Sequence, residues 1–255
     1  MNMAIQTILY PSMNHSGEDK LYSITMEKIT DFVFDDKVIR VFADMIRRSV
    51  PGYGTLLAML PVIVRHFVTP GSQCYDLGCS QGACTLAIRH SLLVNNINII
   101  AVDNSPAMVA SCREQLAQDH GSTPVELVCD DICHTPVDNA SLVVMNFTLQ
   151  FIEPVARPAL IKTIYNGLND GGALLLSEKI QLADQDSELI TELHEAFKRS
   201  NGYSELEISQ KRTALEKVLL PETIEQHKQR LLATGFSHVT VWFQCFNFVS
   251  LLAVK

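Results

Sequence analysis

The sequence predicts an α/β protein with a doubly wound, mostly parallel sheet of seven strands. Between Gln73 and Ser177, short apolar runs alternate with longer runs of helical periodicity, which is typical of parallel strands joined by helices. The chain then closes with two β-rich runs, at 239–243 and 248–254, which we expect to pair antiparallel at one edge. With 47% hydrophobic residues, the 255-residue chain can bury the core that such a fold requires.

The part before the first strand is expected to be helical after an irregular start. Residues 1–20 are polar and irregular, so we expect a flexible N-terminus there and a single domain over 21–255. Apolar residues recur at helical spacing over 35–49, and 55–68 is predicted as a mostly apolar helix. We expect these helices to form a cover or outer layer at about 35–68.

The alternating part supplies five strands and the helices between them. The expected strands lie at 73–77, 97–102, 125–129, 141–147 and 173–177. The expected helices lie at 82–94, 105–119 and 154–168. The following run, 184–233, has helical character almost throughout, and we interpret it as an insert. Together with the N-terminal helices it should cover the carboxyl edge of the sheet, where ligands bind in such folds.

Charge and hydropathy exclude some classes of protein. The net charge is −8, and no basic run is longer than Arg47-Arg48, which argues against tight direct binding of nucleic acid. No apolar run reaches the roughly 18 residues of a membrane span, and the amino terminus lacks a signal-peptide pattern. We therefore expect a cytoplasmic protein, without a membrane partner, that acts on a small substrate.

The seven cysteines are odd in number and none forms a Cys-x-x-Cys pair. This usage favours reduced, buried thiols rather than a disulfide framework. Cys129, Cys133 and His134 resemble half of a zinc site, but a second pair of ligands is missing. We therefore predict no metal.

The first functional pattern is the turn after the first strand. Asp76 closes the strand, Gly78 allows a backbone turn with positive φ, and Gly82 allows the next helix to approach closely. The spacing Asp-x-Gly-x-x-x-Gly differs from the Gly-x-Gly-x-x-Gly of dinucleotide sites. It fits the loop that surrounds the amino-acid end of S-adenosylmethionine (SAM). Alone, the pattern is a weak signal and favours an ordinary glycine turn over a ligand site.

The second pattern is the acidic end of the next strand. Asp103 follows an apolar run 25 positions after Gly78, where a carboxylate can accept hydrogen bonds from both hydroxyls of a ribose. Asn104 would then lie beside the adenine. Ser105 and Pro106 are a helix N-cap and first helical residue. The alternative is that Asp103 only caps this helix, but both patterns in order favour a nucleoside site.

At this point the chain resembles the bacterial carboxy-S-adenosyl-L-methionine (carboxy-SAM) synthases of the class I methyltransferase superfamily. The resemblance covers about 19–255. The segments that carry it are 75–80, 103–108, 146–151, 171–179, 197–212 and 242–248. The first two are shared by many SAM-binding enzymes, whereas 197–212 and 242–248 are much more specific.

The resemblance implies a transferase that uses SAM and prephenate. Prephenate would become phenylpyruvate, and its carboxyl carbon would join the methyl group of SAM to give carboxy-SAM. A tRNA carboxymethyltransferase would then use this product to modify a wobble uridine, so the chain itself need not contact tRNA. The resemblance also implies a homodimer. Two alternatives remain: an ordinary SAM-dependent small-molecule methyltransferase, and a SAM-binding scaffold without turnover.

The same resemblance implies a set of site residues. The expected SAM ligands are Tyr53, Gly78, Cys79, Ser80, Asp103, Asn104, Asp131, Ile132, Asn146 and Arg212. Asp131 suits the adenine amino group as an acceptor, and Ile132 would give the ring an apolar wall. Tyr53, Asn146 and Arg212 are the expected catalytic residues. Tyr53 would lie near the sulfonium through cation–π attraction, and Asn146 would lie at the end of the fourth strand.

Arg212 is the expected clamp for the carboxylate that carboxy-SAM has and SAM lacks. A planar guanidinium can bind a carboxylate through two hydrogen bonds. From its surroundings alone, Arg212 would instead belong to a solvated helix face. We also consider that it reaches the site of a neighbouring subunit, because 184–233 is a candidate dimer element. Arg199 and Tyr203 are secondary candidates for binding prephenate.

Overall fold

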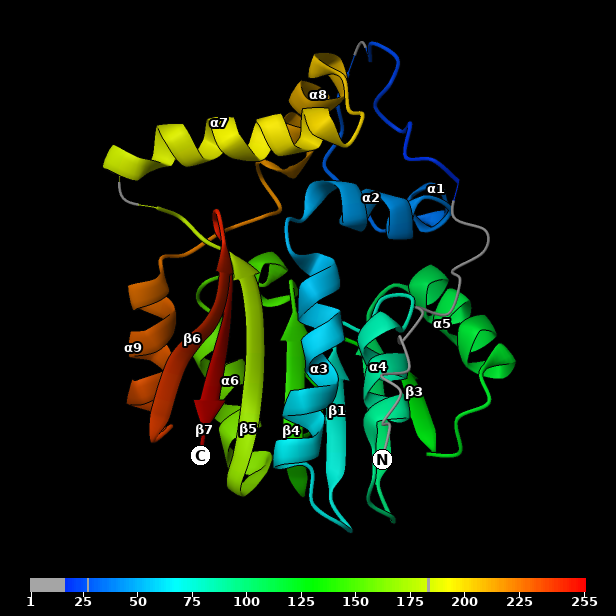
Figure 1. Cartoon of the computed structure of the whole chain (residues 1–255), viewed down its shortest axis with the longest axis vertical. Coiled ribbons are helices and arrows are strands. Elements are labelled where there is room, and N and C mark those ends of the chain that lie inside the picture. The colour runs from blue at the N-terminus through cyan, green and yellow to red at the C-terminus, as the bar shows by residue number, and fades with distance from the viewer. Residues whose placement is uncertain (1–16, 27, 183) are drawn as a thin grey trace, which may run out of the picture.

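The computed structural model describes residues 17–26, 28–182 and 184–255. They form a seven-stranded sheet with the strand order β3-β2-β1-β4-β5-β7-β6 (Figure 1). The strands are β1 (Gln73–Leu77), β2 (Asn98–Asp103), β3 (Val125–Cys129), β4 (Ala140–Asn146), β5 (Leu168–Lys179), β6 (His238–Cys245) and β7 (Phe248–Val254). The expected α/β class and the expected number of strands are confirmed.

The sheet is mixed rather than purely parallel. β1 to β5 pair in parallel, whereas β7 runs antiparallel to both of its neighbours, β5 and β6. The closing hairpin was expected, and it places the one reversed strand inside the sheet, next to β5. β5 begins five residues earlier than predicted, because the preceding helix ends at Gly167. Because β1 to β5 run parallel, their carboxyl ends meet at one edge of the sheet.

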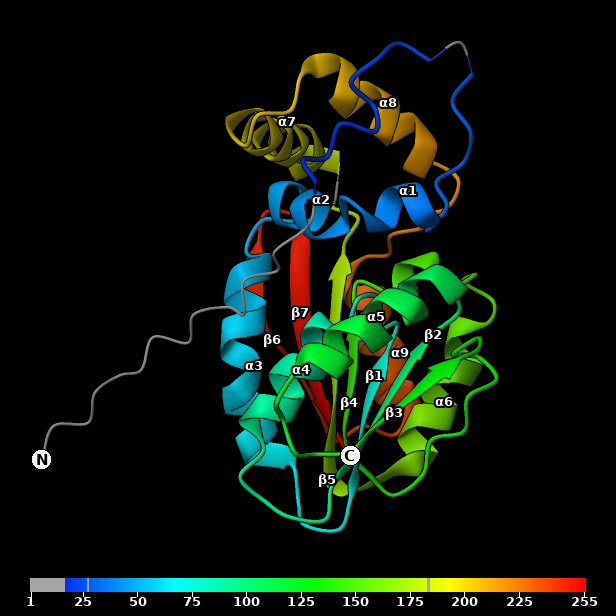
Figure 2. The ribbon, with the colours of Figure 1, turned by 90° about the vertical axis from the view of Figure 1, so that its right-hand side faces the viewer.

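Helices cover both faces of this sheet, as a doubly wound fold requires (Figures 1 and 2). One face packs against α3 (Tyr53–Phe67), α4 (Ala83–Ser91) and α5 (Pro106–Gln118). The other packs against α6 (Arg157–Gly167) and α9 (Ile224–Thr234). As predicted, α5 begins with Ser105, whose hydroxyl accepts the Met108 N–H, and with Pro106 in its first turn.

The remaining helices lie above the carboxyl edge of the sheet and form a cover over it (Figure 2). They are α1 (Asp36–Ile39), α2 (Phe42–Ser49), α7 (Asp184–Ser200) and α8 (Glu205–Leu215). The expected insert was drawn too long, since α9 buries Leu231 in the sheet core instead of joining the cover. Likewise α3 belongs to the outer layer, because Leu60 and Val64 pack on the sheet.

A buried ionic network joins the cover to the start of the described chain. Asp19 accepts hydrogen bonds from Tyr203 and from Lys211, whose Nζ lies 3.3 Å away. The Asp19 N–H donates to Asp44, which also pairs with Arg48 at 3.0 Å. Asp19 is only 2% exposed although it lies in the segment expected to be flexible. The rest of that segment, 1–16, lies outside the described residues.

Candidate functional site

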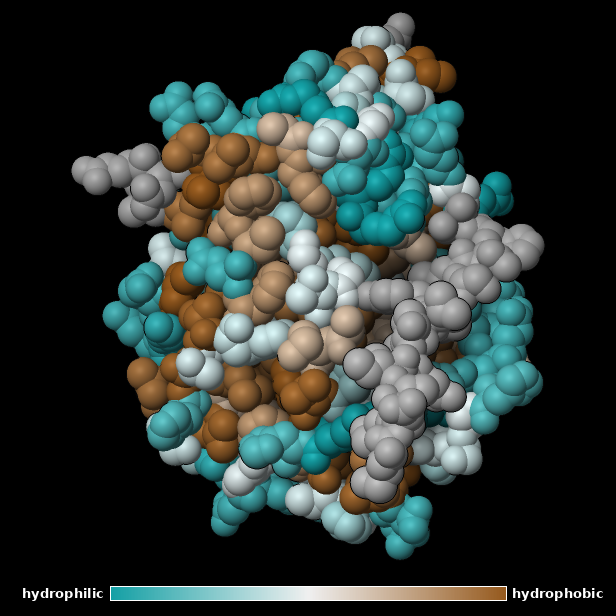
Figure 3. All heavy atoms as spheres, in the orientation of Figure 1, coloured by the Kyte–Doolittle hydropathy of each residue, from teal (hydrophilic) through white to brown (hydrophobic). Residues whose placement is uncertain are grey.

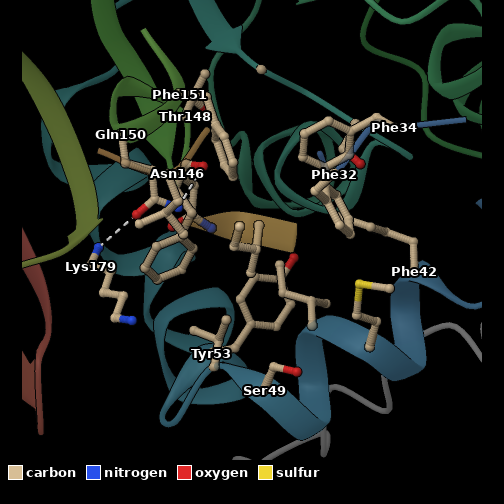
Figure 4. Close-up of a pocket in the computed structure, with 18 of the residues that line it drawn as sticks. Phe32, Phe34, Phe42, Ser49, Tyr53, Asn146, Thr148, Gln150, Phe151 and Lys179 are labelled. Atoms are coloured by element: carbon tan, nitrogen blue, oxygen red, sulfur yellow. Dashed lines mark hydrogen bonds between the residues drawn. The ribbon is translucent and has the colours of Figure 1, made fainter. Parts of the chain in front are cut away.

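A cavity of about 960 Å³ lies between the carboxyl edge of the sheet and the cover (Figure 4). Its walls come from the strand ends, from α2 and α3, and from α7 and α8. Nine of the ten predicted SAM ligands line it: Tyr53, Gly78, Cys79, Ser80, Asp103, Asn104, Asp131, Ile132 and Asn146. They come from four separate strand ends and from α3, so the fold brings together residues that are distant in sequence.

The turn between β1 and α4 has the strained shape that its glycines predict. Gly78 and Gly82 have φ of 87° and 89°, and a Cβ on Gly78 would lie 2.2 Å from Thr148 Oγ1. The N–H groups of Gly78 and Cys79 donate to the Val102 carbonyl, at 2.8 and 2.9 Å. Since these two donors are used inside the turn, its carbonyl oxygens are the groups suited to a ligand ammonium.

Asp103 is held in one orientation by two backbone donors. Its Oδ1 accepts the Ser105 N–H and its Oδ2 accepts the Ser80 N–H, each at 2.9 Å. Burial raises the pKa of Asp103. Each carboxylate oxygen keeps a further lone pair, so the group can still accept hydrogen bonds from a diol in the cavity. The alternative role as helix cap falls to Ser105, whose own side chain caps α5.

Asn146 carries an unsatisfied group. Its Nδ2 donates to Cys84 Sγ at 3.3 Å, whereas its buried Oδ1 has no hydrogen-bond partner among the described residues. Leaving such an acceptor buried and unpaired costs about 1–3 kcal/mol. A ligand donor in the cavity would remove that cost, so the residues present fit a polar ligand at the end of β4.

The wall beyond β3 suits a flat ring. Ile132 is buried and presents its side chain to the cavity, next to Asp131. Asp131 Oδ1 accepts the Cys133 N–H at 2.8 Å, which fixes the carboxylate beside that apolar wall. Figure 4 shows Phe32 and Phe34 on one side of the cavity and Asn146 with Thr148 on the other. An apolar cleft with a few fixed polar groups is the usual form of a small-molecule site.

Basic side chains that were not predicted as site residues also line the cavity, among them Lys179, His194, Lys198 and Lys211. Burial lowers the pKa of Lys179, that of Lys198 to about 7 and that of Lys211 to about 8. Burial likewise lowers the pKa of His194 to about 3. Lys179 ends β5, and its position at a strand end is a signal that could have identified it.

Arg212 does not line the cavity of its own chain, contrary to the expected clamp. Its side chain is 63% exposed and pairs with Glu195. Successive helical residues point about 100° apart, so when Lys211 faces the cavity, Arg212 faces away from it. The positive charge of Arg212 still contributes, after burial, to the lowered pKa of Lys179, so the guanidinium lies close to the outer side of this wall.

The secondary candidates also lie outside the cavity lining. Arg199 is an exposed residue that pairs with Glu205 at 3.0 Å. Tyr203 is buried below the Arg48 guanidinium, 4.0 Å from its ring centroid, and donates to Asp19. Both residues therefore support the cover, and Tyr203 does so from within the ionic network.

The described residues contain neither a metal-binding cluster nor a membrane-spanning helix. No group of three or more metal-binding side chains occurs among them. No helix in the described part is long and apolar enough to cross a membrane. All seven cysteines are free; Cys129 is exposed, contrary to the expected burial, because it ends β3 at the sheet edge.

The strand order and the helical layers are those of the methyltransferase-like α/β fold. Residues 75–172 match the family model described as a methyltransferase domain. A solved structure of a putative SAM-dependent methyltransferase from Methanococcus maripaludis aligns with a TM-score of 0.59 and 19% identity, covering 91% of this chain and 97% of that one. At that identity the likeness shows the fold alone.

Much closer relatives narrow the class. Carboxy-S-adenosyl-L-methionine synthase of Sodalis glossinidius is 52% identical over 238 residues, covering 93% of this chain and 96% of the relative. The synthase of Trichlorobacter lovleyi is 55% identical over 239 residues, covering 93% and 98%. The chain belongs to the carboxy-S-adenosyl-L-methionine synthase family, and it is an enzyme.

Proposed function

We propose that this enzyme converts SAM and prephenate to carboxy-SAM and phenylpyruvate. The observation that carries the proposal is the identity of 52–55% to named synthases over about 94% of the chain. The cavity supports it further, because it has both polar groups suited to a nucleoside and lysines suited to an anion. Its volume of about 960 Å³ accommodates two small ligands together.

The proposed SAM site uses the nine predicted residues of the cavity. Asp103 would accept the ribose hydroxyls, and Asn104, Asp131 and Ile132 would surround the adenine. The β1–α4 turn would receive the methionine ammonium through its carbonyl oxygens. Asn146 Oδ1 and the Tyr53 ring would face the sulfonium, where an electron-rich ring is favourable. Bound SAM would supply a sulfonium that makes its methyl group acidic.

The atoms of this reaction balance. Prephenate loses its ring carboxyl group and its ring hydroxide as the ring becomes aromatic. The carboxyl carbon forms a bond to the SAM methyl carbon, one methyl C–H bond breaks, and that proton leaves with the hydroxide as water. Because aromatisation drives the step, the protein mainly holds the two ligands together and excludes water. The cover is suited to both tasks.

We propose further that the enzyme is a homodimer in which Arg212 reaches the cavity of the partner subunit. Arg212 is exposed and does not line the cavity of its own chain. A clamp for the product carboxylate must face a cavity, and the cavity of a partner subunit would meet that need. The outer surface of α7 and α8 carries exposed leucines, Leu189, Leu193 and Leu206. Apolar side chains are visible on this side of the molecule in Figure 3. Such a patch suits contact with another copy.

The product would pass to a tRNA carboxymethyltransferase, which places the protein in the cytoplasm in this proposal. The net charge of −8 agrees with a chain that supplies the donor without binding the tRNA itself.

Arg212→Ala is expected to weaken binding of carboxy-SAM about tenfold while SAM affinity changes by less than about twofold. Equal losses for both ligands would remove the clamp role.

The experiment for the reaction is direct incubation of the pure protein with SAM and prephenate. We expect phenylpyruvate and a SAM species heavier by one carboxyl group, in equal amounts. Unchanged prephenate would overturn the proposal. Formation of S-adenosylhomocysteine with a small acceptor would favour an ordinary methyltransferase, and mass spectrometry of the nucleotide that co-purifies with the protein would identify a scaffold that binds without turnover.

A further inference from the structure

Four of the basic side chains that line the cavity are close enough to one another to shift each other's pKa, although they come from three elements. Lys179 ends β5, His194 and Lys198 lie one helical turn apart on α7, and Lys211 lies on α8. No short sequence pattern links these elements. The cover must be in place over the sheet edge for the four side chains to share one wall.

Two of these four side chains are already held by the protein. Lys211 pairs with Asp19 at 3.3 Å and donates to Ser49 Oγ at 3.0 Å. The ring of His194 bonds to the Ser49 carbonyl at 2.8 Å through Nε2 and contacts Phe248. Burial keeps the pKa of His194 near 3, so its ring is neutral at pH 7 and donates to the carbonyl. Both residues therefore stabilise the protein around the cavity.

The other two, Lys179 and Lys198, are cations without anions. Neither has an ion-pair partner within 4.0 Å in the part of the chain that the structure describes. Burial lowers the pKa of both, and the charges of Lys179 and Lys211 lower that of Lys198 further. Two half-buried ammonium groups close together are costly unless an anion neutralises them or one loses its proton.

None of the four acidic side chains that line the cavity pairs with Lys179 or Lys198 within 4.0 Å. Asp103 and Asp131 lie at the ends of β2 and β3, the nucleoside side, and Asp44 pairs with Arg47 and Arg48 on α2. Glu153, which follows the 3-10 helix at Leu149–Phe151, is exposed. The cavity is therefore polarised, with acceptors at one end and lysines at the other. Asp19 neutralises Lys211, but no described carboxylate lies within 4.0 Å of Lys179 or Lys198, so a bound anion would supply their complementary charge.

The position of Lys179 relates the lysine end to the reacting atoms. Asn146 is paired with Ser177 in the sheet, and Lys179 lies two residues beyond Ser177, which is about 7 Å along β5. The Lys179 backbone is fixed, since its N–H donates to Gln150 Oε1 at 3.0 Å (Figure 4). A substrate of small-molecule size could therefore place an anionic group at Lys179 and its reacting atoms near Asn146.

We propose that Lys179 and Lys198 together bind a carboxylate of the second substrate, namely the carboxylate that the reaction retains. The identity of this substrate as a dicarboxylate rests on the proposed function. A cation on the carboxyl group that departs would stabilise the ground state more than the transition state, because that group loses its charge as it leaves. The lysines are therefore assigned to the 2-oxo acid end, which survives in phenylpyruvate.

The test compares Lys198→Met and Lys179→Met with Lys37→Met, an exposed lysine of α1 that does not line the cavity. Methionine keeps a long, apolar stem and removes only the charge. In each lysine-pair variant we expect the KM for prephenate to rise about tenfold or more, since a charged hydrogen bond is lost. SAM affinity, measured by calorimetry, should change by less than about twofold, and the Lys37 variant should resemble the wild type.

Lys198→Arg keeps the charge and should retain most of the affinity for prephenate, which a purely structural role would not require. The pH profile is a second signature. Because carboxylate binding needs the ammonium form, the KM of the wild type should rise as the pH increases above about 7, and Lys198→Met should abolish that rise. If the wild type turns over prephenate and the methionine variants keep its KM, the lysine site is wrong while the proposed function stands.

Direct binding separates the two claims if no carboxy-SAM forms. Phenylpyruvate carries the retained carboxylate, so calorimetric titration of the SAM-saturated protein with phenylpyruvate reads the site without turnover. Weaker binding in both methionine variants, with binding kept in Lys198→Arg, would support the site even where the proposed reaction fails. Equal binding in all variants would overturn it.

Discussion

Asp103→Asn tests the nucleoside end of the cavity. In the structure both carboxylate oxygens accept a backbone N–H at 2.9 Å, and each keeps a lone pair toward the cavity. Asparagine keeps the shape but has one acceptor oxygen and no charge, so at least one charged hydrogen bond to a ribose hydroxyl is lost. Such a bond contributes ~1.5–3 kcal/mol. We therefore expect SAM to bind about 10- to 150-fold more weakly.

The assay is isothermal titration with SAM, together with urea unfolding of the free protein. Asp119→Asn is the matched control, because Asp119 also accepts a backbone N–H, from Gly121, and pairs with Arg89 away from the cavity. The control should leave SAM affinity within about twofold. A change below about threefold for a folded Asp103→Asn protein would refute the assignment of this carboxylate to the ribose.

Three further predictions concern stability and binding. Gly78→Ala places a Cβ 2.2 Å from Thr148 Oγ1 at a φ of 87°, so the free energy of unfolding should fall by ~2–4 kcal/mol in urea titrations; a loss below ~1 kcal/mol would contradict the strain. Asn146→Leu removes an unpaired buried acceptor, so the melting temperature of the free protein should hold or rise while SAM affinity falls about tenfold; unchanged affinity would exclude the contact. Between pH 7 and 9 the unfolded chain keeps the Lys198 proton, whereas the folded chain loses it near pH 7. The free energy of unfolding of the wild type should therefore rise with pH, and it should rise less in Lys198→Met. Equal slopes in the two proteins would show that folding does not lower the pKa of Lys198.

The local chemistry of the nucleoside end was predictable from sequence. A glycine turn after an apolar strand, and an acidic residue at the end of the next strand, depend on backbone geometry that short patterns encode. The alternation of strands and helices likewise predicted the sheet. In the structure the turn that begins at Gly78 contacts Asp103 through the Ser80 N–H, because β1 and β2 are adjacent strands.

The cover was harder to predict, because helical periodicity does not say which surface a helix contacts. α9 has the same helical pattern as α7 and α8, yet it packs on the sheet. Lysines in a polar helix, such as Lys198, look like a solvated face until tertiary contacts bury them. Asp19 was missed for a related reason, since its burial depends on Tyr203 and Lys211, far along the chain.

Arg212 and its neighbour Lys211 point to different sides of α8, so a shift of one residue decides which of them faces the cavity. The resemblance pointed to this arginine, and its neighbour Lys211 is the one that faces the cavity of the same chain. The proposed clamp across a subunit contact would reconcile both facts, and the active site would then depend on the dimer. Single-chain sequence patterns contain no information on such a contact.

The most direct measurement follows a labelled carbon. Prephenate carrying ¹³C in its ring carboxyl group is incubated with the enzyme and unlabelled SAM, and the nucleotide product is examined by mass spectrometry and NMR. We expect the label in the carboxyl group of carboxy-SAM, bonded to the former methyl carbon, with phenylpyruvate unlabelled. Label recovered only as carbon dioxide or in unreacted prephenate would contradict it.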